Sequence, residues 1–545
     1  MNKKQLFIFI LIFALGIFLR IYDLSNVPPG VNRDEASIGY TAYSLLQTGK
    51  DEYGIKYPLS FQSFGDWKLP LYIYTVVPFV KIFGLSEIAV RLPSVIFGVS
   101  SIILTFFLVK ILFRNTVLAL FSMLLIAISP WHLHLSRVES ESNMAAFLIL
   151  LSAILLLKSK KPKEWLIIPS FMGFALTYYT YAGNYIFTTL LTVGIFILYK
   201  KQLLNNRFFY FGGFLFLALF LFISYQTVFS ANKTKLSGIS IFGDPSIVHE
   251  KIELPRADHK DVNLFSKIFH NKIVFAAERF AGNYLNSYSP EFLFIKGGGN
   301  HAHNISNFGN MYLIEAPFFF LGLVWLLFFR KKTESKLILF WLLIAPIAAA
   351  ITKDAPHTNR MFSVFPALAI VTGLGLYHAL VFLKRAKVIR YASVLVVFAY
   401  LINIGIYLDR YYVHFPTNEA EHWGIAYKEL TGVLNEDRYK SKKVIFAKPE
   451  YSHYIFLLFY SAYDPKTYQE TAKRYPPTQD KFVNVMGYDR FEFREIDWSK
   501  DLIEKNILLI DFSEDIPPLV KIKKYSTSEI KLPNGKSMLT IVETK

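Results

Sequence analysis

The chain has 545 residues, of which 53% are hydrophobic and 18% are charged, and its mean hydropathy is +0.34. This composition excludes an ordinary soluble enzyme and is typical of a polytopic membrane protein. Cysteine is absent, which excludes a disulfide framework, a thiolate nucleophile and cysteine-ligated zinc. The net charge of +18 would suit nucleic-acid binding, but the basic residues lie largely in short clusters between apolar spans, which argues against it.

The first apolar stretch, Gln5–Leu19, follows the basic sequence MNKK. No small-residue cleavage site precedes Arg20, and more apolar spans follow. We therefore expect an uncleaved membrane anchor instead of a signal peptide.

Two adjacent carboxylates, Asp34 and Glu35, follow this anchor in the sequence VNRDEASIGYTAY. An acidic pair just outside a membrane anchor is a candidate for general acid–base chemistry. The structural alternative is that Asp34 only caps a helix that runs from Glu35 to Leu46.

A membrane-spanning helix needs about 17–25 mostly apolar residues. The stretch Leu69–Phe83 is apolar but short, and it contains Pro70, Pro78 and Lys81. Apart from that stretch, we expect about eleven spans, near residues 5–21, 89–109, 116–133, 143–157, 165–180, 184–199, 208–229, 311–329, 337–352, 361–383 and 391–408.

Basic clusters between the spans indicate the orientation, because Lys and Arg mark cytoplasmic loops. If 69–83 lies on the membrane without crossing it, every cluster falls on the side of the N-terminus. We therefore expect 69–83 to be interfacial or re-entrant, in a multi-pass protein of the plasma (inner) membrane whose N-terminus is cytoplasmic. The polar loops then lie outside the cytoplasm; they are 22–88, 131–142, 230–310 and 353–360.

The segment 410–545 is more charged and mixes two kinds of element. Strands are predicted at 444–447 and 507–510, a helix at 451–463, and a hairpin turn at Asn534-Gly535. The predicted fold is a polytopic α-helical membrane domain, 1–409, followed by a small extracytoplasmic α/β domain, 410–545.

Lys68 lies where the first outer loop meets the membrane surface. A lysine there could bind a lipid phosphate as a point charge. The structural alternative is a snorkelling anchor residue.

The second outer loop contains His132, His134, Arg137, Glu139 and Glu141. The H-x-H spacing is only a weak metal signal, because a third ligand would have to come from elsewhere. Arg137 and Glu141 are four residues apart, so we expect them to share a helix face. They would form either a structural ion pair or a site in which the arginine holds phosphate and the glutamate faces the substrate.

The long loop offers Asn283, Tyr284, His301 and His303 around a run of glycines that is not a P-loop, because no GK[ST] follows it. These residues suit a pocket that stacks on and hydrogen-bonds a sugar; an ordered re-entrant loop is the alternative. His357 and Arg360 follow at the outer mouth of a span, where an arginine is costly and tends to be functional.

Together these residues predict the transfer of a sugar from a phosphate-linked lipid. A carboxylate would activate the acceptor hydroxyl as general base, and Lys and Arg would stabilise the departing phosphate. No nucleotide-binding glycine motif is needed for such a donor.

The stretches DEASIGYTAYSLLQTGKDEYG, DWKLPLYIY and HLSRVESESNMAAFLILL resemble the bacterial polyprenyl-phosphate-sugar glycosyltransferases of the GT-C superfamily. These are relatives of the protein O-mannosyltransferases (glycosyltransferase family 39) and of the aminoarabinose transferase that modifies lipid A. The resemblance covers about 1–410 and is most specific over 20–150.

The resemblance implies roles for individual residues. Asp34 matches the family's acidic residue in the first outer loop, a base or a metal-linked carboxylate, and Glu35 adjoins it. Lys68 matches the lysine that holds the lipid phosphate, although the family's KPPLY reads KLPLY here. Glu141 matches a second acid that follows a Ser-Arg pair in the family, Arg137 matches the arginine of that pair, and Arg360 matches the arginine that opens a late span. Tyr40, Asn283, Tyr284, His301, His303 and His357 complete the expected substrate contacts.

In the aminoarabinose enzyme an acidic residue directly precedes the lysine, whereas Trp67 stands here. The metal site is therefore unknown, and a divalent cation is left open as a cofactor. The expected partners are a polyprenyl-phosphate-linked sugar, an extracytoplasmic acceptor (lipid, glycan or protein) and the bilayer, with no nucleic acid. The alternatives are a transporter or lipid flippase, for which we find no internal repeat, and a non-catalytic scaffold for envelope polymers.

Overall fold

The computed structural model describes residues 1–229, 240–242, 245–257, 264–329, 332–385, 387–478, 482–522 and 525–544. Parts of the predicted loop 230–310 therefore lie outside the described residues. The chain packs into two compact units. The helical unit comprises Met1–Tyr22 and Ser94–Tyr407, and the mixed unit comprises Asp23–Pro93 and Leu408–Lys545. The predicted boundary at 409/410 differs from this partition, because 23–93 belongs to the mixed unit; a functional division at that point stays a prediction.

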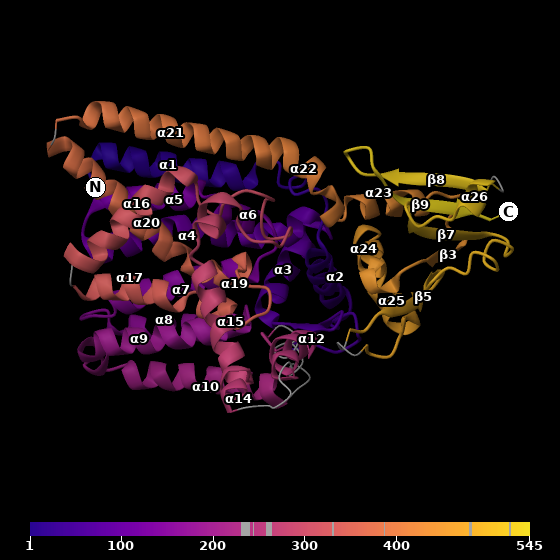
Figure 1. Ribbon diagram of the computed structural model, residues 1–545, viewed down its shortest axis with the longest axis horizontal. Coiled ribbons are helices and arrows are strands. Elements are labelled where there is room, and N and C mark those ends of the chain that lie inside the picture. Colours follow the sequence, from indigo (N-terminus) through magenta and orange to yellow (C-terminus); the bar gives the residue numbers. More distant parts are fainter. Residues whose placement is uncertain are drawn as a thin grey trace. The chain divides into compact units, whose positions relative to one another are not determined.

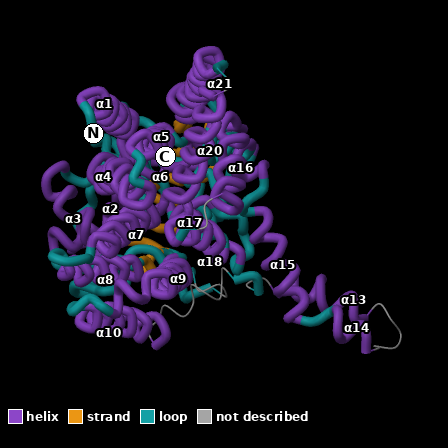
Figure 2. The backbone as a smooth tube through the Cα atoms, turned by 90° about the vertical axis from the view of Figure 1, so that its left-hand side faces the viewer, coloured by secondary structure: helices purple, strands orange, loops and turns teal. Residues whose placement is uncertain are grey.

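Helices of the helical unit run side by side (Figure 1), and Figure 2 views this bundle along the helix axes. Among the described residues, eight helical segments are long and apolar enough to cross a membrane, or nine if the bent pair α5–α6 is one span. The eight contain α1 (Lys3–Ile21), α4 (Glu87–Phe113), α7 (Glu141–Lys158), α9 (Asn184–Leu204), α10 (Phe209–Phe229), α17 with α18 (Thr333–Ile344, Ile347–Ala350), α19 with α20 (Thr358–Met361, Phe365–Arg385) and α21 (Ile389–Asp409). The predicted polytopic helical membrane fold is confirmed.

Two further predicted spans are occupied by shorter apolar helices, α8 (Ile167–Leu176) and α16 (Ala316–Val324). Other short helices of this unit are α12 (Pro245–Val248), α13 (Leu254–Ala257), α14 (Leu264–Phe269) and α15 (Lys272–Asn286).

The predicted span 116–133 is broken into α5 (Thr116–Ile128) and α6 (Pro130–Arg137), which are bent by 55°. Pro130 lacks an N–H group and is tolerated at the first position of a helix but not inside one. The Ser129 side chain caps the second helix by accepting from the His132 backbone N–H. The break therefore has a local cause, and it turns α6 away from the line of α5.

Close approach of α16 and α20 depends on two glycines. A Cβ atom at Gly322 would collide with the carbonyl group of Val371, and one at Gly375 with that of Phe318. Small residues allow helix backbones to approach in this way in membrane bundles, where van der Waals contact drives association.

The first part of the mixed unit contains α2 (Arg33–Thr48), the antiparallel pair β1 (Phe61–Ser63) and β2 (Asp66–Lys68), and α3 (Pro70–Phe83). Helix α3 has 14 residues, which at about 1.5 Å per residue is short of a hydrocarbon core of roughly 30 Å. Shorter helices occupy predicted spans as well, so whether 69–83 crosses the membrane stays a prediction.

The second part of the mixed unit is built on a seven-stranded sheet in the order β4-β5-β6-β3-β7-β9-β8. Strand β3 is parallel to β6 and β7, and the other pairs are antiparallel. The strands are β3 (Lys443–Phe446), β4 (Lys473–Arg474), β5 (Val485–Tyr488), β6 (Phe491–Phe493), β7 (Ile507–Phe512), β8 (Ser526–Lys531) and β9 (Ser537–Glu543). The helices are α22 (Phe415–Asn418), α23 (Ile425–Leu434), α24 (His453–Tyr460), α25 (Pro465–Thr471) and α26 (Pro518–Ile522).

Several of these elements were predicted from local sequence. The predicted strands coincide with β3 and β7, and the predicted helix with α24. The turn between β8 and β9 contains Gly535 at φ +84°, a conformation that glycine adopts without steric cost.

The two parts of the mixed unit are joined through the backbone that precedes α2. The Gly424 N–H donates to the Val31 carbonyl oxygen at 2.7 Å. The Tyr460 hydroxyl of α24 accepts from the Val31 N–H at 2.9 Å. The start of α2, which carries Asp34, is therefore held by residues about 400 positions later in the chain.

Candidate active site

Helix α2 begins at Arg33, and its N-cap is Asn32. The Asn32 side chain accepts from the Glu35 N–H at 2.9 Å, and the Glu35 carboxylate accepts from the Asn32 N–H at 3.2 Å. These two bonds form a capping box. The structural alternative in which Asp34 caps the helix is therefore wrong, because Asp34 is already inside the first turn.

Asp34 and Lys68 are brought together as the sequence analysis expected for a shared site. The Lys68 ammonium, at the end of β2, donates to the Asp34 carboxylate at 2.7 Å. The Lys68 side chain is only 8% exposed, whereas that of Asp34 is 54% exposed. The result is a carboxylate at the surface of the mixed unit with a largely buried cation beneath it.

Glu35 has a different environment from its neighbour. It is completely buried, and its two carboxylate oxygens accept from Arg91 Nε at 2.9 Å and Nη2 at 3.0 Å. Arg91 also donates to the carbonyl oxygens of Leu24, Pro28 and Gly30. This network ties the loop before α2 to the start of α4, and so it positions the first turn that holds Asp34. Arg91 is a functional-site residue that was not predicted, although a charged residue in an apolar stretch is a signal in itself.

Tyr40 was predicted to contact substrate. It is completely buried, its hydroxyl donates to the Tyr463 carbonyl oxygen at 3.2 Å, and its ring packs edge-on against Tyr468. These contacts give the side chain a packing role between α2 and the C-terminal part of the unit. A substrate contact would need this packing to open.

A second acid that sequence analysis did not single out, Glu52, is buried in the same unit. Burial raises its pKa to about 7, although the Arg474 guanidinium opposes the shift. The Tyr454 hydroxyl lies 3.5 Å from its carboxylate. Lys68 is among the charges that act on this group, so Glu52 lies near the Asp34–Lys68 pair.

Arg137 and Glu141 of the helical unit do not share a helix face as predicted. Helix α6 ends at Arg137 and α7 begins at Glu141, with Ser140 as its N-cap. Three non-helical residues therefore separate the two, and the spacing rule for one continuous helix does not apply. Arg137 is completely buried and donates to the Leu19 carbonyl oxygen at 2.9 Å, which anchors α6 to the end of α1.

Arg360 is the centre of a polar cluster in the helical unit. Its guanidinium donates to the Thr352 hydroxyl at 2.8 Å and forms an ion pair with Asp354. Burial disfavours the carboxylate form of Asp354, but the hydrogen bond and charge of Arg360 outweigh burial and hold the pKa of Asp354 below its usual value. Burial and the Arg360 charge lower the pKa of His357 well below its usual value, so its imidazole is neutral at neutral pH.

The long loop and the loop 353–360 meet in this cluster, as the predicted common face requires. The rings of His303 and His357 lie 5.3 Å apart between centroids. The Thr358 hydroxyl donates to the Asn304 side chain at 2.7 Å. Asn359 accepts from Ser142, the residue after Glu141, which brings the start of α7 to the same cluster.

Asn283 and Tyr284 make structural contacts on α15. The buried Asn283 amide donates to the carbonyl oxygens of Ala350 and Thr352 at 3.0 and 2.9 Å, which satisfies the end of α18. The Tyr284 hydroxyl donates to the Leu343 carbonyl oxygen at 2.7 Å. His301 is exposed, and its Nδ1 lies 3.0 Å from the Ser306 hydroxyl.

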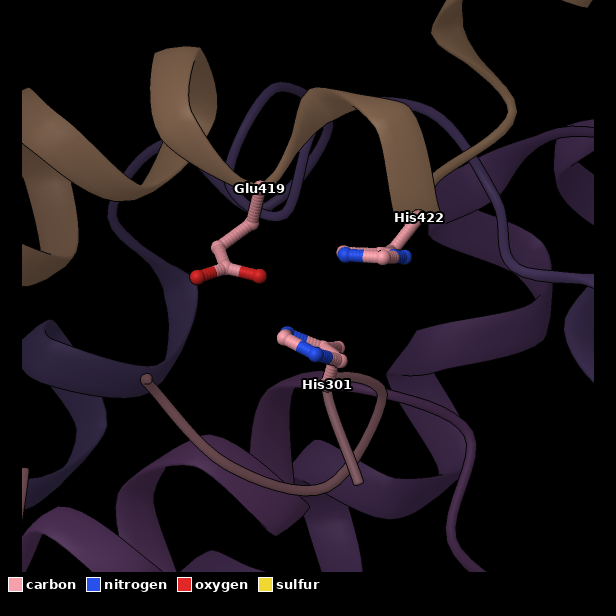
Figure 3. Close-up of side chains that lie close together, drawn as sticks. All are labelled: His301, Glu419 and His422. Carbon is pink, nitrogen blue, oxygen red and sulfur yellow. The ribbon is translucent and has the colours of Figure 1, made fainter. Parts of the chain in front are cut away.

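In the part of the chain that the structure describes, imidazole and carboxylate groups that could ligate a metal are considered at two places. His132 and His134 lie two residues apart on α6, so they point to different sides, and His132 Nδ1 lies 2.8 Å from an Arg20 nitrogen. In the mixed unit, Glu419 and His422 project into the same space (Figure 3), with ligand atoms within 4.8 Å of each other. Within the mixed unit these two side chains are a partial donor set, and the metal dependence stays open.

Residues 68–225 match the sequence profile of a family described as dolichyl-phosphate-mannose-protein mannosyltransferase. The match begins at Lys68 and covers less than half of the chain. No curated protein sequence matches the chain.

Solved structures share the fold over nearly the whole chain. ArnT from Cupriavidus metallidurans bound to undecaprenyl phosphate is 11% identical with a TM-score of 0.52, covering 99% of this chain and 98% of that one. AglB, the archaeal oligosaccharyltransferase from Archaeoglobus fulgidus in complex with an inhibitory peptide and a dolichol-phosphate, is 13% identical with a TM-score of 0.50, covering 100% of this chain and 74% of that one. The predicted resemblance is confirmed by the family match over 68–225 together with the shared fold, and at these identities the structures by themselves establish the fold alone.

Proposed function

We propose that this chain is an integral-membrane glycosyltransferase that transfers a monosaccharide from a polyprenyl-phosphate donor to an extracytoplasmic acceptor. The family match over 68–225 and the fold shared with ArnT and AglB support this class of reaction. The observation that carries the proposal is the contact between the exposed Asp34 carboxylate and the Lys68 ammonium at 2.7 Å. It combines a base and a phosphate-binding cation in one place.

In the proposed reaction Asp34 accepts the proton of the acceptor hydroxyl, while the oxygen of that hydroxyl forms a bond to the sugar C1. The bond between C1 and the phosphate oxygen breaks, and polyprenyl phosphate leaves with both electrons. Lys68 stabilises the negative charge of the leaving phosphate. Its ammonium has three N–H donors, so it can contact the carboxylate and the phosphate together. As the phosphate attracts Lys68, Asp34 becomes a stronger base, and donor binding is coupled to base strength.

Arg360 is the second proposed phosphate ligand, because an arginine fork recognises phosphate geometry and its Asp354 partner holds it at the end of a span. His301, His303 and His357 are proposed to face the substrate, and Glu141 to act near them. Glu35 and Arg137 are positioning residues in this proposal, since buried carboxylate and guanidinium groups with protein partners are not available to react.

The proposed topology has about eleven crossings of the plasma (inner) membrane, with the N-terminus in the cytoplasm. The outer loops and the segment 410–545, with its α/β sheet, lie outside the cytoplasm. This orientation places Asp34 and Lys68 where a lipid-linked donor exposes its sugar.

The test uses the full-length protein in lipid nanodiscs with a series of polyprenyl-phosphate monosaccharides. The expected result is release of polyprenyl phosphate, with no turnover of nucleotide sugars. Lys68→Ala should raise the KM for the donor by roughly tenfold or more, as for a lost charge-assisted hydrogen bond of about 1.5–3 kcal/mol. If no member of the series is consumed, and Lys68→Ala binds the donor as the wild type does, the proposed function is wrong.

A further inference from the structure

The mixed unit contains a cavity of about 360 Å³ that the proposed chemistry does not use. It lies beside α23 and α24 and is lined by residues at the ends of β7 and β9 as well as by Arg33 at the start of α2. All of its lining residues belong to the mixed unit. Its volume is within the range of small-molecule sites, about 300–1,000 Å³.

Aromatic rings form the floor and one edge of this cavity. Tyr427 and Phe456 stack with centroids 4.3 Å apart and planes 7° from parallel, and both are buried. Trp423 is 1% exposed and completes the floor. Tyr451 contacts Phe512 edge to face at 5.1 Å, and at 53% exposure it forms the rim. Flat apolar surfaces of this kind are suited to stacking against a ring.

Charged groups of both signs surround the aromatic floor. Lys536 and Glu421 form an ion pair at 3.1 Å, and each side chain is about half exposed. Arg33 and Glu514 supply one more cation and one more anion. The charges of these four side chains balance, and His422 also lines the cavity. The cavity presents several hydrogen-bond donors and acceptors around an apolar floor.

We propose that this cavity binds a neutral carbohydrate. A pyranose ring has an apolar face of C–H groups, which matches the aromatic floor, and an edge of hydroxyl groups that both donate and accept, which matches the balanced rim. An extended peptide is less well matched, because it would need backbone partners along its length.

The position of the cavity gives this sugar a role that rests on the proposed function. Arg33 lines the cavity, and the next residue in the chain is Asp34. Both residues belong to the first turn of α2, and their Cα atoms are about 3.8 Å apart. In this proposal the acceptor is a glycan, and the cavity holds one of its sugar units close to that first turn.

The test measures binding directly on the full-length protein in nanodiscs. The probes are neutral α- and β-linked hexose disaccharides, with the tripeptide Gly-Ser-Gly as a comparison, and the readouts are saturation-transfer NMR and titration calorimetry. Tyr451→Ala should weaken disaccharide binding by roughly tenfold, whereas Tyr451→Phe keeps the ring and should bind nearly as the wild type does. Tyr57→Ala is the matched control, because Tyr57 is a similarly exposed tyrosine of the same unit that does not line the cavity.

Asp34→Asn separates this proposal from the proposed function. It should bind disaccharide like the wild type, even though transfer is lost. Three results would each overturn the carbohydrate site. They are disaccharide binding that Tyr451→Ala leaves unchanged, no binding of any disaccharide at millimolar concentration, and binding of the tripeptide alone. If the wild-type protein binds disaccharide through Tyr451 but does not consume any polyprenyl-phosphate donor, the carbohydrate site is supported and its role as acceptor site is wrong.

Discussion

The neighbours Asp34 and Glu35 should respond to substitution in opposite ways. Glu35→Gln keeps the side-chain volume and one acceptor for the capping box, but it removes the charge that faces Arg91. Asp34→Asn makes the same chemical change one residue earlier, at a side chain that is 54% exposed. We expect Glu35→Gln to destabilise the mixed unit and Asp34→Asn to destabilise it much less, because Asp34 is exposed and an asparagine oxygen can still accept from the Lys68 ammonium.

The size of the effect follows from the burial of the ion pair. Both side chains of the pair are completely buried, and two hydrogen bonds of 2.9 and 3.0 Å join them. Removing one partner of a buried pair costs about 3–5 kcal/mol, because the other charge stays buried without compensation. The three backbone carbonyl groups around Arg91 soften this penalty, so we expect about 3 kcal/mol. For a unit of this size that corresponds to a fall in Tm of roughly 6–12 °C.

The assay is thermal unfolding of both variants in the same detergent, followed by tryptophan fluorescence. Trp423 is a useful reporter, since the Arg91 guanidinium lies 5.7 Å from the centroid of its ring. A double-mutant cycle with Arg91→Gln should show that the second substitution costs much less when Glu35 is already neutral. Equal Tm values for Glu35→Gln and Asp34→Asn would refute the assignment of Glu35 as a structural residue.

Three further outcomes follow from the same contacts. Because burial raises the pKa of Glu52 from 4.5 to about 7, its ionisation destabilises the fold as pH rises through that window. Glu52→Gln should therefore increase stability by up to about 2–3 kcal/mol at pH 8 and by almost nothing at pH 4, and a gain that does not depend on pH would contradict this. Gly375→Leu should lower the Tm of the helical unit, because α16 leaves no room for a side chain, while Gly213→Leu, with no atom within 4 Å of its Cβ position, is the tolerated control. Arg360→Ala should raise the KM for the donor more than it lowers kcat, and an unchanged KM would exclude a phosphate contact.

Much of the helical unit could be predicted because apolar length is a local property of the sequence. The long spans near α1, α4, α7 and α20 follow directly from it. The break at Ser129-Pro130 was missed, although the serine-proline pair is a start signal for a helix. The prediction that Arg137 and Glu141 share a face was wrong for a related reason. Residues four positions apart share a face only if the helix between them is continuous.

The first turn of α2 shows which features of the candidate site could be predicted from the sequence. The pattern N-R-D-E contains the capping box of Asn32 and Glu35, and recognising it would have removed Asp34 as the cap. The contact between Asp34 and Lys68 was anticipated by placing both on one outer loop. The ion pair between Glu35 and Arg91 was not anticipated, because the two residues are 56 positions apart and no local pattern links them.

The packing of 23–93 with the C-terminal segment could not be predicted by local reasoning. It depends on single long-range bonds, such as that from Gly424 to Val31, for which neither residue carries a signal. The carbohydrate cavity depends on the same packing, since Arg33 and the residues of α23 and α24 lie far apart in the chain.

The most direct test of the account is the rate of sugar transfer by Asp34→Asn in nanodiscs with a donor that the wild type consumes. The account predicts a fall of roughly 10²–10⁴-fold in kcat, as for loss of a general base, with only a small change in Tm. Wild-type turnover by this variant would contradict the role of Asp34, and with it the proposed site.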